Sequence, residues 1–410
     1  MALWQKENST DNAIKVILFV FLPVLSFVYS LRSLNTKTSF IVFFLCAVLF
    51  GMAYTVPSGP TVEIGVDGAY YRLEFDNAKF LSEVEFLEGW NSFLNFDEGK
   101  KDYYFETVSY YLSRFTDNYH VMFMVLATVF AFFSLKSFKF FTEEIGQQIG
   151  LGVFILAYMF MYNQIFNING VRFWTATWIG VYAIFQIFKN NKKQYWLLVL
   201  VTPYFHGSFW IFIGVLILAE LTRRFEKTWV ILFGFSFVFS NIAIEFLQSY
   251  QDTLPAFMSG MVNDYTDAEY VKSRNEVGIG YGFIPHTFDI LMRIYQALLI
   301  FLFIKNSKQI RSNNKTNNLY LFLLVWASVF NFFAFVPSLG VRFNTFVWPL
   351  IAYIWLVNFK QVKYKEVLYG MPLVFAWNFF TMFGYYNMVL TWDFYISSPV
   401  VLIFKYLIIG

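Results

Sequence analysis

The sequence predicts an all-α, polytopic integral membrane protein, and three observations support this fold class. Of the 410 residues, 58% are hydrophobic and 23% aromatic, whereas only 14% are charged; a soluble domain has about 25% charged residues. Apolar runs of roughly 20 residues, the length at which a helix crosses a bilayer, recur along the whole chain. Such runs are longer than the ~10-residue alternating segments of an outer-membrane barrel.

Candidate spans cover most of the chain. We expect about 12 transmembrane helices in a single integral membrane domain, residues 1–410, because no internal repeat or low-complexity linker divides the sequence. One span is ambiguous, because Pro203 and Gly207 bracket His206 and split the run into two short halves. The predicted spans are 13–31, 39–55, 119–137, 149–166, 171–188, 194–221, 229–247, 286–304, 317–336, 343–359, 367–384 and 391–409.

The positions of lysine and arginine predict the orientation of these spans. Four short basic loops should be cytoplasmic, namely 189–193, 223–227, 305–315 and 360–365. The span 194–221 must then enter and return as a hairpin, with His206 at its tip near the outer surface. The same reasoning places the N-terminus outside and the C-terminus inside. It also predicts two long extracytoplasmic loops, 56–118 and 248–285; in the first, twelve acidic against five basic residues give a net charge of −7.

Two arginines at outer helix ends are the main candidates for binding a ligand. Arg172 follows an asparagine-rich turn that includes Asn169, and Arg342 recurs in a similar setting far along the chain. A guanidinium group matches phosphate oxygens bidentately, so we predict that Arg172, Arg342 and Asn169 bind a diphosphate. The alternative is an arginine that only snorkels from a helix end to the lipid headgroups.

His206 and Asp67 are the candidates for catalysis. A neutral imidazole can accept a proton from a sugar hydroxyl near pH 7, and a carboxylate beside Tyr70 and Tyr71 can bind sugar hydroxyls or act as a base. The alternatives are a histidine that caps a broken helix and an aspartate that only shapes a turn between glycines.

Other polar residues give weaker signals. Tyr70, Tyr71, Arg274 and His286 are predicted as weaker sugar-binding residues. Asp289 and Arg293, four residues apart in the sequence, are typical of an ordinary ion pair within one helix.

Several classes of protein are excluded or disfavoured. No Cys/His cluster has the spacing of a metal site, so we expect no metal and no cofactor. A net charge of +3, without a basic run, argues against binding of nucleic acid. The only cysteine, Cys46, cannot form an intramolecular disulfide.

Short motifs then resemble one family, the EpsG-like exopolysaccharide polymerases, which are relatives in role of the Wzy polymerases. The resemblance covers roughly residues 40–360. In one departure, Phe173 stands where the family often has glutamine directly after the arginine. The similar motifs are Asp67-Gly68-Ala69-Tyr70-Tyr71, Phe115-Thr116-Asp117-Asn118, Asn169-Gly170-Val171-Arg172, Phe205-His206-Gly207-Ser208 and Val341-Arg342-Phe343.

The resemblance implies a metal-independent glycosyltransferase in the bacterial inner (cytoplasmic) membrane. It would join oligosaccharide repeat units, carried on undecaprenyl diphosphate, at the outer face, for an exopolysaccharide, a capsule or an O-antigen. Expected partners are the lipid-linked glycan, membrane lipid, a chain-length regulator and a flippase. The alternatives are a lipid-linked oligosaccharide flippase, although such transporters more often show paired repeats, and a glycosyltransferase like the O-antigen ligases.

Overall fold

A computed structural model describes residues 4–56, 67–97, 101–146, 149–237, 249, 259, 283–334, 340–360 and 363–409. Every element within these residues is helical, so the all-α class is confirmed for the described part of the chain. The first elements are α1 (Ser9–Phe21), α2 (Pro23–Ser30), η1 (Leu31–Ser33), α3 (Lys37–Ala53), α4 (Asp67–Ala78), α5 (Glu83–Asn95), α6 (Tyr104–Leu112) and α7 (Tyr119–Thr142).

The remaining elements follow in two groups. The middle of the chain forms α8 (Leu151–Phe160), η3 (Ile165–Gly170), α9 (Val171–Ile184), η4 (Phe185–Lys189), η5 (Lys193–Tyr195), α10 (Trp196–Phe205), α11 (Phe209–Thr222) and α12 (Glu226–Phe235). The last third forms α16 (Phe283–Lys305), α17 (Ser307–Arg311), α18 (Asn317–Phe332), α19 (Gly340–Asn344), α20 (Val347–Asn358), α21 (Lys365–Tyr369), α22 (Met371–Val374), α23 (Ala376–Val389), α24 (Asp393–Ile396), α25 (Pro399–Ile403) and η7 (Phe404–Ile409).

Within the described residues, four helical stretches are long and apolar enough to cross a membrane: Tyr119–Thr142, Leu151–Lys189, Thr287–Lys305 and Gly340–Asn358. Other predicted spans form shorter apolar helices, among them Lys37–Ala53, Phe209–Thr222 and Asn317–Phe332. The predicted number of about 12 spans is therefore not confirmed. Breaks within the apolar runs shorten the helices, and a run of apolar residues does not reveal these breaks.

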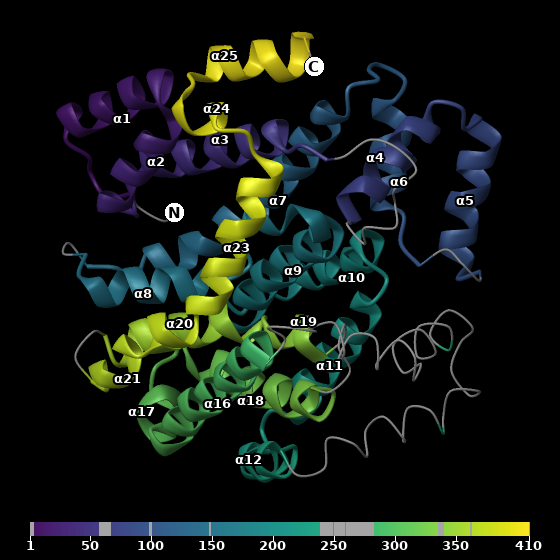
Figure 1. Cartoon of the computed structure of the whole chain (residues 1–410). Coiled ribbons are helices and arrows are strands. Elements are labelled where there is room, and N and C mark those ends of the chain that lie inside the picture. Colours follow the sequence, from purple (N-terminus) through teal and green to yellow (C-terminus); the bar gives the residue numbers. More distant parts are fainter. Residues whose placement is uncertain are drawn as a thin grey trace.

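The helices pack as a bundle around one apolar core (Figure 1). Helix α3 packs on α7, α7 on α9 and α9 on α10, and a second set joins α8 to α20 and α18 to α11, α12 and α20. Gly51 on α3 faces Ala127 and the backbone of Phe123 on α7 so closely that a side chain at position 51 would collide with both. The absent side chain therefore lets α3 and α7 approach each other. The core itself is aromatic, with Trp178, Trp326 and many phenylalanines fully buried.

The two ends of the bundle have different chemistry. Helix α9 and its continuation η4 run from Arg172 to Lys189, a rise of roughly 25 Å at 1.5 Å per residue. We call the two ends of the bundle the Arg172 end and the Lys189 end. At the Lys189 end the predicted basic loops meet, for example through a hydrogen bond from Lys363 to Gln309 and an ion pair between Arg311 and Glu226. The structure thus groups the loops that the charge pattern assigns to one side.

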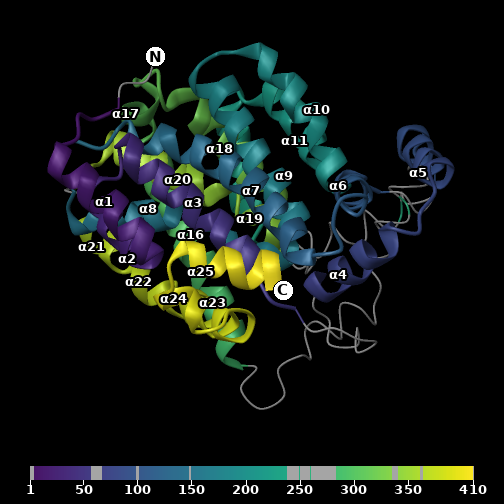
Figure 2. The ribbon, with the colours of Figure 1, turned by 90° about the horizontal axis from the view of Figure 1, so that it is seen from above.

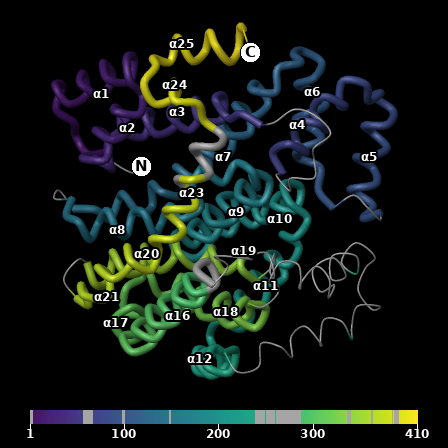
Figure 3. The backbone as a smooth tube through the Cα atoms, viewed as in Figure 1, coloured from purple at the N-terminus to yellow at the C-terminus, as the bar shows by residue number. Residues whose placement is uncertain are grey.

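The predicted hairpin over 194–221 is confirmed. Helix α10 starts at the Lys189 end, where Tyr195 contacts Tyr182, and α11 returns there, where the Arg223 guanidinium lies 5.0 Å from the centre of the Phe188 ring. Between the helices, His206 has extended backbone and lies at the tip, at the Arg172 end. Figure 3 shows the chain turning back between α10 and α11. Gly207 lies at this reversal, as its position predicted, whereas Pro203 lies inside α10, which continues to Phe205.

The first predicted span, 13–31, does not cross the bundle. It forms a hairpin of α1 and α2, broken at Pro23, whose carbonyl lies against Cys46 in the middle of α3. Lys15 on α1 donates hydrogen bonds to Thr36 and to Ser39, at the start of α3. The chain therefore enters and leaves this hairpin at the Lys189 end, where the basic loops lie, whereas the charge pattern predicted the N-terminus on the side opposite to these loops. A proline inside an apolar run ended the helix and reversed the chain.

The last predicted span, 391–409, is also a hairpin. Helix α24 ends before Pro399, and α25 with η7 returns, so that the hydroxyls of Thr391 and Tyr406 lie 2.7 Å apart. The Tyr406 carbonyl accepts a hydrogen bond from Asn118, the N-cap of α7. The C-terminal segment therefore returns to the Arg172 end, opposite to the prediction. Figure 3 shows α24 and α25 beside α1, α2 and α3.

The predicted long loop 56–118 contains three helices rather than irregular chain. Helices α4, α5 and α6 form a layer at the Arg172 end, in which α4 and α6 pack against α7 and α5 lies farther out (Figures 1 and 2). Helix α5 begins with a capping box, in which Ser82 and Glu85 bond each other's backbone amides. The other predicted loop, 248–285, lies outside the described residues except for 249, 259 and the start of α16.

Candidate functional site

Arg172 occupies the second position of α9 and contacts two segments from the layer of α4, α5 and α6. Its Nη1 atom donates to Asp102 Oδ1 over 2.8 Å, and its Nε atom donates to the hydroxyl of Tyr71 over 3.3 Å. The Arg172 side chain is 26% exposed and that of Asp102 only 8%. The guanidinium group is therefore held by an ion pair with a nearly buried carboxylate, yet it remains open to a ligand.

Helix α4 reaches this site because its first turn is tied to the turn before α9. The amide oxygen of Asn169 accepts a hydrogen bond of 2.6 Å from the Gly68 N–H. Tyr71, one turn later, is 2% exposed, and burial raises the pKa of its phenol. Tyr71 therefore stays protonated and accepts from Arg172 while keeping a proton to donate. Asn169, predicted to bind diphosphate, thus holds α4 against the start of α9.

Asp102 also joins Arg172 to the tip of the α10–α11 hairpin. Its Oδ2 atom accepts from the backbone N–H of Gly207 over 3.3 Å. Next to it, the Tyr103 N–H donates to the Tyr204 carbonyl over 3.1 Å. A Cβ atom at Gly207 would collide with the backbone of Lys101, so the two segments approach as closely as a glycine allows.

Sequence reasoning missed Asp102. It is one of twelve acidic residues in 56–118, and nothing in its neighbours distinguishes it from the others. The only usable signal was the need of a half-buried arginine for a counterion, and this need does not say which carboxylate supplies it. Glu106, one turn further on in α6, also acts electrostatically on Arg172.

His206 is held with one ring nitrogen occupied. Its Nδ1 atom accepts a hydrogen bond from the Ser208 N–H over 3.3 Å and lies 2.8 Å from the Ser208 hydroxyl. A neutral imidazole whose Nδ1 is an acceptor carries its proton on Nε2. The ring meets Phe173 edge to face at 5.2 Å between centroids.

Arg342 completes the group from a distant part of the chain. It lies in α19, and its guanidinium carbon is 5.5 Å from the centre of the Phe173 ring. Phe173 therefore contacts both Arg342 and His206, at the position where the resemblance had suggested glutamine. The positive charges of Arg172, Arg342 and Lys101 all act on His206. The structure thus brings together three of the predicted residues: Arg172, His206 and Arg342.

The EpsG family matches residues 43–397 of the chain. This chain belongs to the EpsG family. The match covers the Arg172 site, the α10–α11 hairpin and α19. The comparison with curated proteins found no match, and neither did the comparison with solved structures. As an EpsG-family protein with several long apolar helices, it is a membrane protein of the polysaccharide-polymerase type.

The remaining predicted residues of this EpsG-family protein lie around or beyond the site. Asp67, exposed at the first position of α4, is one turn before Tyr71 and acts on it electrostatically. Tyr70 is 45% exposed. Arg274 lies outside the described residues, and His286 is in the first turn of α16 with its side chain outside what the structure describes.

The predicted pair on α16 has a further contact. Arg293 donates to the Ala334 carbonyl over 2.6 Å, and the charge of Asp289 acts on it. The ion pair between Asp289 and Arg293 stays a prediction.

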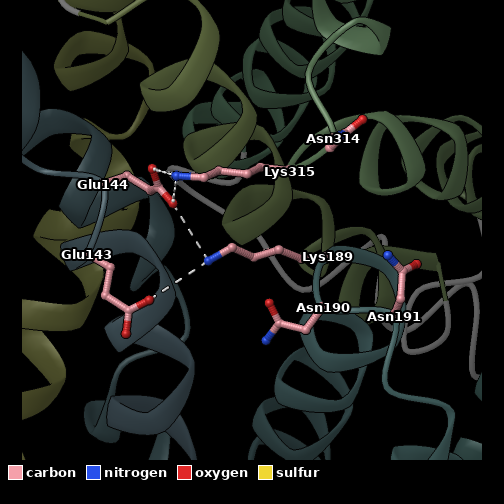
Figure 4. Close-up of a pocket in the computed structure, with 7 residues that line it drawn as sticks. All are labelled: Glu143, Glu144, Lys189, Asn190, Asn191, Asn314 and Lys315. Atoms are coloured by element: carbon pink, nitrogen blue, oxygen red, sulfur yellow. Dashed lines mark hydrogen bonds and ion pairs between the residues drawn. The ribbon is translucent and has the colours of Figure 1, made fainter. Parts of the chain in front are cut away.

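A second polar cluster lies at the Lys189 end of the EpsG-family protein (Figure 4). Lys189, 8% exposed, points between Glu143 and Glu144 at 3.9 and 3.7 Å, and Glu144 also pairs with Lys315 at 2.8 Å. The hydroxyl of Tyr353 donates to Glu144 over 3.1 Å. A cavity of about 540 Å³ is lined by Glu143, Glu144, Lys189, Asn190, Asn191, Asn314 and Lys315. The cluster is balanced in charge and ties three loops together, which indicates a structural role.

Proposed function

We propose that this EpsG-family protein is a polysaccharide polymerase that joins oligosaccharide repeat units carried on undecaprenyl diphosphate. The observation that carries the proposal is the convergence of Arg172, His206 and Arg342 at one end of the bundle. They come from three separate parts of the chain, and Arg172 remains 26% exposed. Positive charges beside an apolar ring, here Phe173, suit a diphosphate attached to a lipid.

The two arginines bind the diphosphate in this proposal. A guanidinium group forms two parallel hydrogen bonds to a phosphate, and two guanidinium groups offset the charge of both phosphates. When the sugar leaves the carrier, negative charge grows on the diphosphate, and fixed positive charges stabilise it at that moment. The reaction needs no redox step, and we assign it no cofactor.

The acceptor sugar approaches from the layer of α4, α5 and α6. This layer carries the exposed Tyr70 and Asp67 next to Tyr71, and these side chains can contact sugar rings and hydroxyls. His206 and Asp67 are the predicted groups for activating the acceptor hydroxyl. We propose that the Arg172 end faces the outside of the inner membrane, because the basic loops gather at the Lys189 end.

The proposal is tested by the length of the glycan in a deletion strain that carries a plasmid with either the wild-type or a variant gene. Wild type should restore long chains, whereas Arg172→Ala should leave single repeat units on the lipid carrier. Arg224→Ala, an exposed arginine beside Phe225 at the other end, is the matched control and should behave as wild type. Normal chain lengths with Arg172→Ala would refute the role of this arginine.

The same experiment separates the alternatives. Repeat units that accumulate on the cytoplasmic leaflet in the deletion strain would indicate a flippase. Finished chains that reach the outer face but are not attached to their final acceptor would indicate a ligase. Both results would replace the polymerase proposal, because a polymerase mutant accumulates single units on the outer leaflet.

A further inference from the structure

We propose that Asp102 is the general base of the glycosyl transfer, and that its ion pair with Arg172 keeps it inactive until a lipid diphosphate binds. This inference rests on the proposed polymerase function and assigns a step within it to a residue that the sequence did not single out. It follows from the position of Asp102, the exposure of Arg172 and the hydrogen bond that His206 Nδ1 accepts from Ser208.

The position of Asp102 is fixed from both sides of the site. One carboxylate oxygen accepts from Arg172 over 2.8 Å and the other from Gly207 over 3.3 Å. The backbone contact of Tyr103 with Tyr204 and the tight approach of Lys101 to Gly207 hold this segment against the hairpin tip. The carboxylate is therefore placed between the arginine that would bind the donor and the loop that carries His206.

Charge explains why Arg172 would exchange Asp102 for the diphosphate when the donor binds. The Arg172 side chain is 26% exposed, whereas that of Asp102 is only 8% exposed. A diphosphate offers the guanidinium several oxygens and more negative charge than one carboxylate, so it competes for the N–H group that Asp102 now holds. Once Arg172 turns to the diphosphate, the nearly buried carboxylate loses a counterion and becomes a stronger base. Donor binding would thus activate the base.

His206 is unsuited to be the base in this geometry. Its Nδ1 atom already accepts from the Ser208 N–H over 3.3 Å, so the neutral ring presents an N–H group at Nε2 rather than a lone pair. An N–H group among cations is suited to donate to a phosphate oxygen. We therefore assign His206 to the diphosphate and the proton of the acceptor to Asp102.

The acceptor hydroxyl oxygen forms a bond to the anomeric carbon of the donor sugar, and its proton passes to an oxygen of Asp102. The bond between that carbon and the phosphate oxygen breaks, and its electron pair stays on the lipid diphosphate held by Arg172 and Arg342. Asp102 then loses its proton to water and pairs again with Arg172 when the diphosphate leaves.

The test uses the purified full chain in proteoliposomes, with lipid-linked repeat units extracted from the deletion strain. Asp102→Asn keeps the shape and an acceptor for the Gly207 N–H but removes the base. We expect kcat to fall at least about 100-fold, the lower range of general base catalysis. Undecaprenyl diphosphate should bind as tightly as to wild type or more tightly, because no carboxylate competes for Arg172. Asp97→Asn, exposed in the same segment, is the control and should match wild type.

The pH profile separates catalysis from positioning. Wild type should lose activity at acid pH as the carboxylate is protonated, and Asp102→Asn should lack this acid limb. His206→Asn should weaken binding of undecaprenyl diphosphate but keep the limb. If kcat and binding fall together in Asp102→Asn with a lower unfolding temperature, Asp102 only holds the structure and the proposal is wrong. The proposal is also wrong if His206→Asn or Glu106→Gln lacks the acid limb of the pH profile while Asp102→Asn keeps both this limb and the wild-type activity.

A second variant covers the case in which Asp102→Asn does not fold. Asp102→Glu keeps the charge but moves the carboxylate by one methylene group. A kcat lowered about tenfold, with a displaced acid limb, supports the proposal; a rate within threefold of wild type and an unmoved limb overturn it. Wild-type protein that elongates no chains would refute the polymerase function itself. Wild type and Asp102→Asn that elongate equally well would refute only the role of Asp102.

Discussion

Replacing Gly207 by alanine tests the contact that builds the site. A Cβ atom at Gly207 would lie 2.9 Å from the Cβ of Lys101 and still closer to the Lys101 carbonyl oxygen, whereas ordinary contacts begin at 3.4 Å. The two backbone segments must therefore separate by at least 0.5 Å. The bond from the Gly207 N–H to Asp102 is already 3.3 Å long, so this separation would largely break it.

The expected loss of activity is large because the displaced groups are those proposed to react. Forcing a side chain into a packed contact costs about 1–3 kcal/mol, and a displacement of about 1 Å at a reacting centre can lower the rate about 100-fold. Gly207→Ala should therefore lower the thermal unfolding temperature of the purified protein and the rate of chain elongation in proteoliposomes.

The chain offers a matched control on the same hairpin. Gly214 lies in α11, and a Cβ atom there would meet nothing within 4 Å. Because alanine favours the helix by up to about 1 kcal/mol over glycine, Gly214→Ala should unfold at the same or a higher temperature with normal activity. Equal rates and unfolding temperatures for the two variants would refute the close approach of Lys101 to Gly207.

Three further predictions concern the wider structure. Tyr71→Phe removes the acceptor of the Arg172 Nε bond, worth about 1 kcal/mol, so KM for the lipid-linked unit should rise about fivefold; an unchanged KM would contradict this contact. Glu144→Gln leaves the ion pairs at the Lys189 end incomplete and should lower the unfolding temperature while glycan length stays normal; shortened glycan would give this cluster a role in polymerisation. In a Cys46→Ser background, Ser9→Cys and Trp392→Cys should react with an impermeant thiol reagent from opposite sides of the membrane. Labelling from the same side would contradict the two terminal hairpins.

Part of the candidate site could be predicted from the sequence. Arg172 and Arg342 stood out because a charged residue at the end of an apolar helix is costly and needs a reason. His206 stood out because Pro203 and Gly207 break an apolar run around it, and the positive-inside rule then required a hairpin. These are local signals, and each depends on a few neighbouring residues and on the solvent that surrounds them.

Other features depended on contacts between distant segments. Asp102 is unremarkable in an acidic stretch, and only its approach to Arg172, 70 residues away, gives it a role. The half-depth hairpins at the two termini could not be predicted from hydropathy, because a hairpin and a crossing helix have the same apolar composition. Pro23 and Pro399 mark the breaks, but a proline in an apolar run can equally kink a helix that still crosses.

The sequence by itself determined the helical class and the bilayer as solvent, because both follow from composition and from the length of the apolar runs. It also singled out Arg172, Arg342 and His206, because these polar residues lie at the ends of apolar helices or at a break in an apolar run. Only the tertiary structure decided which carboxylate pairs with Arg172, which ring nitrogen of His206 is occupied and at which end of the bundle each terminal hairpin begins and ends. The physical reason is that these properties arise from the packing of backbone segments that are far apart in the chain, such as Lys101 against Gly207. A local sequence pattern does not predict such contacts.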